Sequence, residues 1–316
     1  LEFKIRGDYM IHIQKYFTQF LFAVFILAAP TSALAAQDDN ARHKPFVYAY
    51  SSSDDIETTA TAVRAKLLGA GFIIAGEYSP YGDVLDIAVT NAALQAATSA
   101  SDFGNFAAVQ RVALTKMGDT VQVIYTNPTY MALAYRLEGD LAETKASLEA
   151  ALGAEDAIGS KKGLEAKKLK KYRYMGFPMF TERFDEPDLL ATYETHDEAV
   201  AHLEEGLASG TGGVSKVYRV DIDGTSDTLF GVALTDGDSS DAHIMGKIDF
   251  EDIRSSAHLP YEVLVKDNQI YALGARFRIA ISFPDLKMVG GHSFAGIMSA
   301  PGAIKKALEN ASGNTK

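Results

Sequence analysis

One order of structural signals occurs twice along this chain. In each occurrence a short strand-like run precedes an amphipathic helix that opens with a capping residue and, three residues later, a glutamate. These features are 46–50, Asp54 and Glu57 in the first occurrence, and 189–193, Thr195 and Glu198 in the second. A chain that repeats its signals in this way is expected to build two similar units.

The correspondence continues beyond the helices. Each unit then contains two strand-like runs, a hairpin and a closing amphipathic helix. These segments are 72–78, 84–90, 109–115, 121–126 and 140–152 in the first unit, and 214–220, 229–235, 260–265, 270–274 and 300–311 in the second. The spacing differs only in presumed loops, where insertions cost little, so we interpret the pattern as a tandem duplication. The alternative is two unrelated α+β stretches.

The repeated order predicts an α+β fold of two tandem two-layer domains, at 46–153 and 188–313. Each domain is expected to be a mainly antiparallel sheet with helices on one face. Two similar domains could pack as a pseudo-dimer, and a groove between them would then be the expected ligand site. Residues 154–187 would form the linker.

The first 35 residues predict a cleaved signal peptide. From residue 10 onward the segment has a lone cation, Lys15, then the apolar run 20–29, then small residues at Ala33 and Ala35. The apolar run has about half of the roughly 20 residues that span a bilayer. We therefore predict cleavage before Ala36 and a periplasmic location in a bacterium, and read residues 1–9 as an upstream extension.

The amino-acid composition excludes several kinds of functional site and disfavours one class of partner. The chain has no cysteine, so it can form neither disulfides nor thiolate metal sites, and it offers no cysteine nucleophile. Its formal net charge of −11 disfavours nucleic acid as a partner, because phosphate contacts require clustered lysine and arginine.

The expected linker is locally basic, with seven cations and one acid between residues 158 and 173. One interpretation is a peripheral contact of 161–173 with anionic lipid or an acidic partner. The alternative is a solvated linker that folds back on the protein's own acids.

Two short motifs resemble the bacterial domain of unknown function family 302. They are the helix ending at 67–72 with Gly-Phe, and the strand ending in Asn127-Pro128. The resemblance covers residues 46–153 and implies a small α+β domain that tends to pair, without catalytic residues to transfer. In the second unit Arg276 and Arg278 stand near where Asn127-Pro128 stands in the first, so that unit reads as a divergent copy.

Arg276 and Arg278 are also the first choice for a ligand site. Their alternation with apolar residues predicts a strand with both guanidinium groups on one sheet face, where they could hold a carboxylate or phosphate. Tyr261 and Tyr271 could line the same region. The alternative is cross-strand pairing with an acid such as Glu262.

Other motifs are weaker. Residues 291–295 approach a nucleophile elbow, but 294–316 contain neither the acid nor the histidine that would follow it. The acidic loops 221–227 and 236–241 could gather calcium ligands, yet they lack EF-hand spacing. His243, Met245 and His258 could ligate a non-covalent haem.

The sequence therefore predicts an exported, non-catalytic binding or interaction protein without a resident cofactor. The expected partner is a small anionic or amphipathic ligand or a periplasmic protein, and no nucleic acid. The alternative is a periplasmic metal or haem carrier. A third and weaker hypothesis is an enzyme with a carboxylate-based site, because the sequence offers no pair of acids that can be placed together in space.

Overall fold

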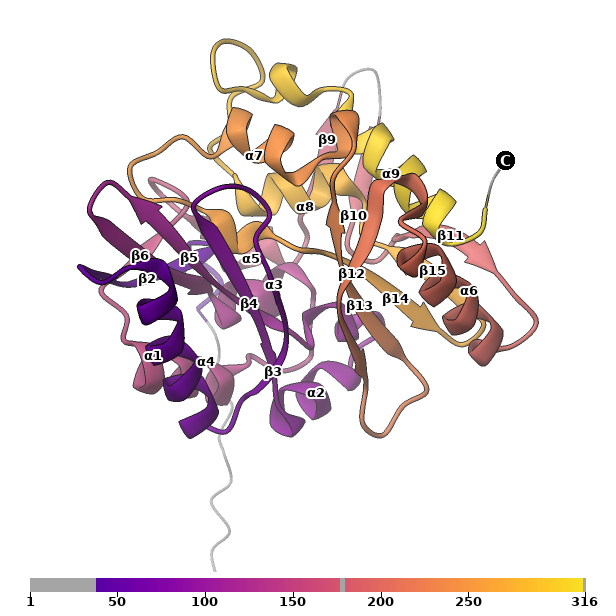
Figure 1. Ribbon diagram of the computed structural model, residues 1–316, viewed down its shortest axis with the longest axis horizontal. Coiled ribbons are helices and arrows are strands. Elements are labelled where there is room, and N and C mark those ends of the chain that lie inside the picture. Colours follow the sequence, from indigo (N-terminus) through magenta and orange to yellow (C-terminus); the bar gives the residue numbers. More distant parts are fainter. Residues whose placement is uncertain (1–37, 177–179, 315–316) are drawn as a thin grey trace, which may run out of the picture. The chain divides into compact units, whose positions relative to one another are not determined.

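Two antiparallel sheets dominate the structure, a computed structural model that describes residues 38–176 and 180–314 (Figure 1). The first half of the described chain forms a six-stranded sheet, and the second half forms a five-stranded sheet. Helices pack against both, so the predicted α+β class is confirmed. The predicted signal segment, with cleavage before Ala36, lies outside the described residues.

The six-stranded sheet has the order β3-β4-β5-β6-β2-β7. Its strands are β2 (Phe46–Ser52), β3 (Ile73–Tyr78), β4 (Val84–Thr90), β5 (Gln110–Met117), β6 (Thr120–Thr126) and β7 (Asp156–Ile158). Helices α1 (Ile56–Gly69) and α4 (Ala142–Leu152) lie on one face, as Figure 1 shows. Their apolar sides, including Val63, Leu67 and Leu148, form one buried cluster with the strands.

The five-stranded sheet has the order β11-β15-β14-β13-β12. Its strands are β11 (Asp188–Thr192), β12 (Val214–Asp221), β13 (Thr228–Leu234), β14 (Tyr261–Lys266) and β15 (Gln269–Ala272). Helices α6 (His196–Ala208) and α9 (Ala300–Ala311) pack against it through Leu203, Leu207 and Ile304.

The two sheets repeat one strand order, position for position. Strands β3-β4-β5-β6-β2 of the first sheet correspond to β12-β13-β14-β15-β11 of the second. The predicted strands and hairpins are therefore present in both halves. A common origin of the halves by duplication stays a prediction.

Reciprocal contacts join the halves. The corresponding edge strands β3 and β12 lie against each other, and a side chain at Gly76 would overlap the carbonyl oxygen of Val217. The 3-10 helix η1 (Gly104–Ala107) of the first half packs on β14, while η4 (Ser256–His258) of the second packs on β5 and β6. Each half thus supplies part of the cover for the other; pairing about a two-fold axis stays a prediction.

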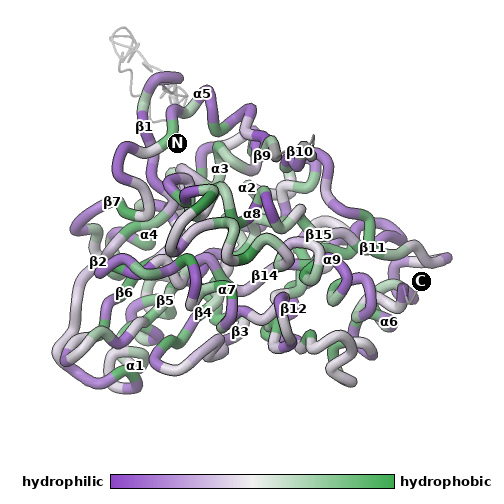
Figure 2. The backbone as a smooth tube through the Cα atoms, turned by 90° about the horizontal axis from the view of Figure 1, so that it is seen from above, coloured by the Kyte–Doolittle hydropathy of each residue, from purple (hydrophilic) through white to green (hydrophobic). Residues whose placement is uncertain are grey.

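Helices α3 (Pro128–Ala134) and α8 (Ala275–Ser282) belong to the apolar cluster shared by the halves. The tube of α3 is coloured mainly as hydrophobic in Figure 2, in line with its nearly complete burial. Further helices are α2 (Ala92–Ser99), α7 (Asp241–Ile248), η2 (Thr211–Gly213), η3 (Gly237–Ser239) and η5 (Phe294–Ile297). Within 38–176 and 180–314, no helix is long and apolar enough to cross a membrane.

The predicted helix caps are right in one half and displaced in the other. Thr195 caps α6 by accepting a hydrogen bond from the amide of Glu198. The cap of α1 is Asp55 rather than Asp54, and its Oδ1 accepts from the amide of Thr58 at 2.8 Å. Both residues are acceptable caps, and the first turn selects the one whose carboxylate reaches the free amide.

The expected linker 154–187 is built from short ordered elements. They are β7, β8 (Leu164–Glu165), which pairs with β1 (Arg42–His43), α5 (Ala166–Leu169), β9 (Arg173–Gly176) and β10 (Phe180–Arg183). Lys170 pairs with Asp39, and Lys167 and Lys168 pair with Glu165. Of these pairs, only Lys170 with Asp39 joins the segment to another part of the chain, because Glu165 belongs to the segment itself. Both the fold-back interpretation and membrane contact through 161–173 stay predictions.

Candidate functional site

Arg276 and Arg278 lie on helix α8, so the predicted strand with both guanidinium groups on one face is wrong. The backbone amides of Arg276 and Phe277 donate to Oε2 of Glu182, which thereby caps this helix. Arg276 Nη1 also contacts Glu182 Oε1 at 2.7 Å. Two residues apart on a helix, the arginines point in different directions.

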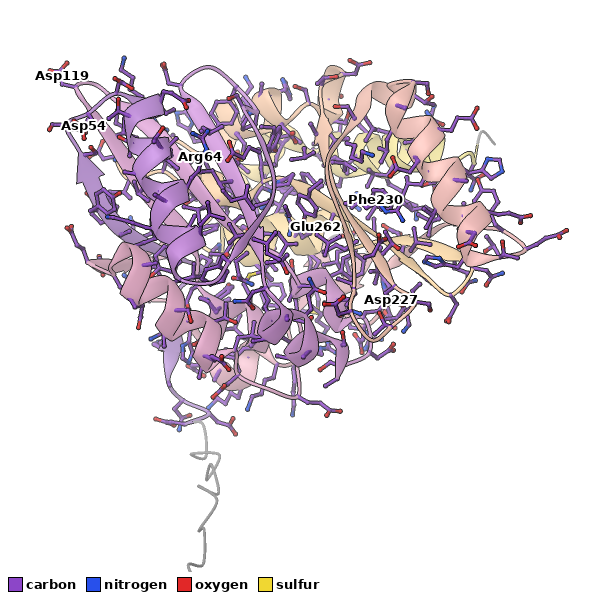
Figure 3. All side chains as sticks on the ribbon, turned by 60° about the horizontal axis from the view of Figure 1, so that its bottom comes forward. Asp54, Arg64, Asp119, Asp227, Phe230 and Glu262 are labelled. Atoms are coloured by element: carbon purple, nitrogen blue, oxygen red, sulfur yellow. The ribbon has the colours of Figure 1, made fainter. Side chains whose placement is uncertain are left out.

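Arg278 belongs to a buried ion triad. Its Nη1 lies 2.6 Å from Oε2 of Glu262, and Arg111 Nη1 pairs with the other carboxylate oxygen. Arg278 also donates to the carbonyl oxygen of His258 at 2.7 Å and to the hydroxyl of Tyr135 at 3.0 Å. Glu262 is only 3% exposed, and Figure 3 shows it where the ribbons of the two halves adjoin. The pairing of Arg278 with Glu262, which was the alternative prediction, is therefore present, but Arg278 makes it from a helix and not from a neighbouring strand.

The two predicted tyrosines lie in different places. Tyr261 is buried, with its ring 5.3 Å from the guanidinium carbon of Arg278. Tyr271 makes an edge contact with Phe103, with ring centroids 5.1 Å apart, and its hydroxyl donates to Gln269. The structure therefore does not bring the four predicted residues together into one accessible pocket.

Of the residues considered for haem, His243 and Met245 lie on helix α7, whereas His258 lies in η4. His258 is fully buried, with Nδ1 2.9 Å from Ser282 Oγ and Nε2 3.3 Å from the hydroxyl of Tyr261. Burial and the charges of Arg278 and Arg111 hold its pKa well below the usual value. Met245 packs in the core of the second half. In the part of the chain that the structure describes, no group of three histidine or acidic side chains could hold a metal ion.

Two buried carboxyl groups lie where the halves meet: Asp241, from the acidic loop considered for calcium, and Asp86, which the sequence did not single out. Asp241 Oδ2 accepts from the amide of Leu234 at 3.1 Å and from the hydroxyl of Tyr78 at 3.3 Å. Burial raises the pKa of Asp241 to about 7. Asp86 on β4 has its pKa raised well above the usual value by burial and by the charge of Asp241. Each carboxyl group lies beside residues from the opposite half, so its ionisation is linked to the contact between the two halves.

An open cleft of about 740 Å³ is the strongest candidate for a ligand site, and residues from both halves line it. Its first wall lies beside β2 and β7 and comprises Lys44, Ile158, Gly159, Ser160 and Lys161. Its second wall comprises Ile248, Asp249, Phe250, Glu251, Asp252, Ile253, Ser255, Phe283, Asp285, Leu286, Lys287, Gly291 and His292. The groove expected between the halves thus has a counterpart, lined by residues other than the four predicted ones.

Polar contacts fix one end of the cleft. Oδ2 of Asp285, on the second wall, accepts from the backbone amide of Lys161 at 2.6 Å, and Ser160 Oγ donates to Oδ1 at 3.2 Å. Elsewhere on the second wall, the ring of Phe250 stacks on His292 with centroids 4.3 Å apart. Phe250 is nevertheless 43% exposed, and Ile253 is 37% exposed. The cleft therefore combines a hydrogen-bonded end with accessible apolar side chains.

Asp249 is the most unusual polar group in the cleft. It is 8% exposed, and its Oδ1 accepts from the amide of Ser255 at 2.9 Å. Its Oδ2 is buried without a hydrogen-bond partner among the described residues. Burial raises the pKa of Asp249 to about 6. A buried carboxylate with a free acceptor is costly unless something else binds it.

Comparisons with protein-family models, curated proteins and solved structures find no match to this chain. The resemblance of the first half to domain of unknown function family 302 therefore stays a prediction.

Proposed function

We propose that this protein is an exported, non-catalytic binding protein that holds a small amphipathic ligand between its two halves. The observation that carries the proposal is the cleft of about 740 Å³, to which both halves contribute. Its size is within the range of about 300–1,000 Å³ that small-molecule sites occupy.

The lining suits a ligand with an apolar body. Apolar side chains alternate with charged ones along the cleft, and Phe250 and Ile253 are substantially exposed to water. Beside the lining residue Lys287, Met288 and Val289 are exposed as well. Apolar side chains gathered around a concave surface are typical of a binding site, since covering them releases water.

Two serine hydroxyl groups and a histidine ring of the region are engaged in structural contacts. Ser293, in the segment that approached a nucleophile elbow, donates to the carbonyl oxygen of Gly290 at 2.7 Å. Ser160 bonds Asp285, and His292 Nδ1 lies 3.1 Å from the carbonyl oxygen of Lys247. Among the described lining residues no histidine is hydrogen-bonded to a serine, which favours binding over hydrolysis.

Export is part of the proposal and rests on the apolar run 20–29 and on Ala33 and Ala35. Intact-mass measurement of the periplasmic protein is expected to give a chain that begins at Ala36. Replacing Ala33 and Ala35 by large residues should leave the precursor uncleaved in the cell fraction. A periplasmic protein that retains residues 10–35 would contradict the predicted signal.

Binding can be tested with the amphipathic dye 8-anilinonaphthalene-1-sulfonate. We expect saturable one-site fluorescence enhancement by the folded protein. The double variant Phe250→Ala, Ile253→Ala should weaken dye affinity about tenfold, because two accessible apolar contacts are lost.

The matched control is Leu68→Ala on helix α1, because Leu68 is 56% exposed but does not line the cleft. Its dye affinity should equal that of the unchanged protein. Non-saturable binding, or equal weakening by the control and the double variant, would argue against the cleft as the site.

A further inference from the structure

The two walls of the cleft carry opposite charges. Both charged residues of the first wall, Lys44 and Lys161, are cationic. The second wall carries four acids, Asp249, Glu251, Asp252 and Asp285, against one lysine, Lys287. A ligand that spans the cleft therefore meets a positive side and a predominantly negative side.

Most of these charges have no ion-pair partner. Within the described residues, Lys44, Lys161, Glu251 and Asp252 have no oppositely charged group within 4.0 Å, although they line one cleft. Lys161 and Asp285 meet only through the backbone amide of Lys161. The side-chain charges of the two walls are thus available to form ion pairs with a molecule bound between them.

Asp249 adds a buried carboxylate with one free oxygen to the negative side of the cleft. Because its pKa lies at about 6, its carboxylate is ionised at pH 7.5, and its Oδ2 has no hydrogen-bond partner in the described structure. The adjacent Phe250 and Ile253 offer apolar surface next to it. An ammonium group with an apolar substituent would satisfy both requirements, since it can donate to the oxygen while its side chain covers the aromatic ring.

We propose that the ligand of this cleft is a short apolar peptide with both termini free, its ammonium bound by Asp249 and its carboxylate facing Lys44 and Lys161. This inference rests on the proposed function and specifies its ligand class. A simple fatty anion would leave Asp249 unpaired, and an apolar amine would leave the lysines unpaired. A zwitterionic peptide complements both walls, and its side chains cover the exposed apolar residues between them.

Trileucine is a suitable probe, studied by calorimetric titration of the full mature protein at pH 7.5. Free trileucine is expected to bind at least about tenfold more tightly than N-acetyl-trileucine or trileucine amide, because each blocked form lacks one of the two charges. Equal affinity for the three peptides would overturn the inference.

Two variants identify which wall of the cleft binds each terminus of the peptide. Asp249→Asn should remove the preference for a free N-terminus while keeping the preference for a free C-terminus. The double variant Lys44→Gln, Lys161→Gln should do the reverse. The controls are the exposed residues Asp119 and Lys116, which lie outside the cleft, as Asp119→Asn and Lys116→Gln. A preference that survives in all variants would contradict the assignment.

The dye experiment separates the two levels of the proposal. If the dye binds in the cleft but trileucine does not bind, the peptide inference is wrong and the proposed binding function stands. If neither binds, and the circular dichroism spectrum shows a folded protein, the binding function itself is contradicted.

Discussion

Replacing Glu262 by alanine is expected to lower the free energy of unfolding by about 3–5 kcal/mol, or to prevent folding altogether. Glu262 is the only acid in contact with both Arg111 and Arg278 among the described residues, and all three are almost completely buried. Without it two guanidinium groups would remain in the interior with no countercharge. Their desolvation would no longer be offset by ion pairing.

Chemical unfolding in urea, followed by circular dichroism, measures this effect. The control is Glu149→Ala, because Glu149 forms an exposed pair with Lys145 one helical turn away. That change should cost less than about 0.5 kcal/mol. A Glu262→Ala protein with nearly unchanged stability would show that the triad does not hold the halves together.

The second large effect concerns pH. Stability is expected to decrease as pH rises from about 4 to about 7, because burial raises the pKa of Asp241 to about 7 in the folded protein. In that interval the folded state keeps a proton that the unfolded state has lost. The contribution is fully present below the unfolded pKa, is lost through pH 7, and amounts to about 4 kcal/mol at most. Asp249, with its pKa raised to about 6, acts in the same direction.

Asp241→Asn isolates this contribution. The amide oxygen of asparagine can still accept from the Leu234 amide and the Tyr78 hydroxyl, but the side chain cannot ionise. Urea unfolding at pH 5 and pH 8 should show a smaller difference for the variant than for the unchanged protein. The part that remains comes from Asp86 and Asp249, because burial raises the pKa of each of these carboxyl groups as well. The exposed turn residue Asp119, changed to asparagine, is the control. A pH dependence that is the same in all three proteins would exclude Asp241 as its origin.

The strands and the closing helices could be predicted because their signals are local. The apolar, β-branched run 84–90 is typical of a buried strand, and the helical spacing of Val63 and Leu67 follows from one face of the helix being buried. The repeated order of these signals also led to the correct α+β class. What the pattern lacked was any information on which face of one half meets the other.

The arginine segment shows how a distant residue overrides a local pattern. Arg276 and Arg278 alternate with apolar neighbours as in a strand, yet they are helical. Glu182, 94 residues from Arg276, caps that helix, and Glu262 draws Arg278 into the interior. The sequence does not reveal the contact with Glu182, and it suggests Glu262 only as a cross-strand partner, because both contacts depend on tertiary packing.

The cleft could be anticipated only in its approximate place, between the halves. Its lining comes from Lys44, from 158–161 and from segments after residue 247, which no local spacing connects. The run Asp249-Phe-Glu-Asp-Ile253 is the one available signal, since it places three acids beside two apolar residues in a loop.

Because η1 and η4 each pack on the sheet of the opposite half, the order in which the chain is synthesised decides when each sheet is covered. When the ribosome has completed β5 and β6, the helix η4 that packs on them is still about 130 residues from being made. A nascent first half would therefore leave Ala113 and Ile124 uncovered beside the side chains of Arg111 and Thr115, all of which contact η4 in the complete protein. Apolar surface that is exposed during folding favours aggregation. A chain secreted before folding would avoid this hazard, because both halves, and the cleft between them, would form together on the far side of the membrane.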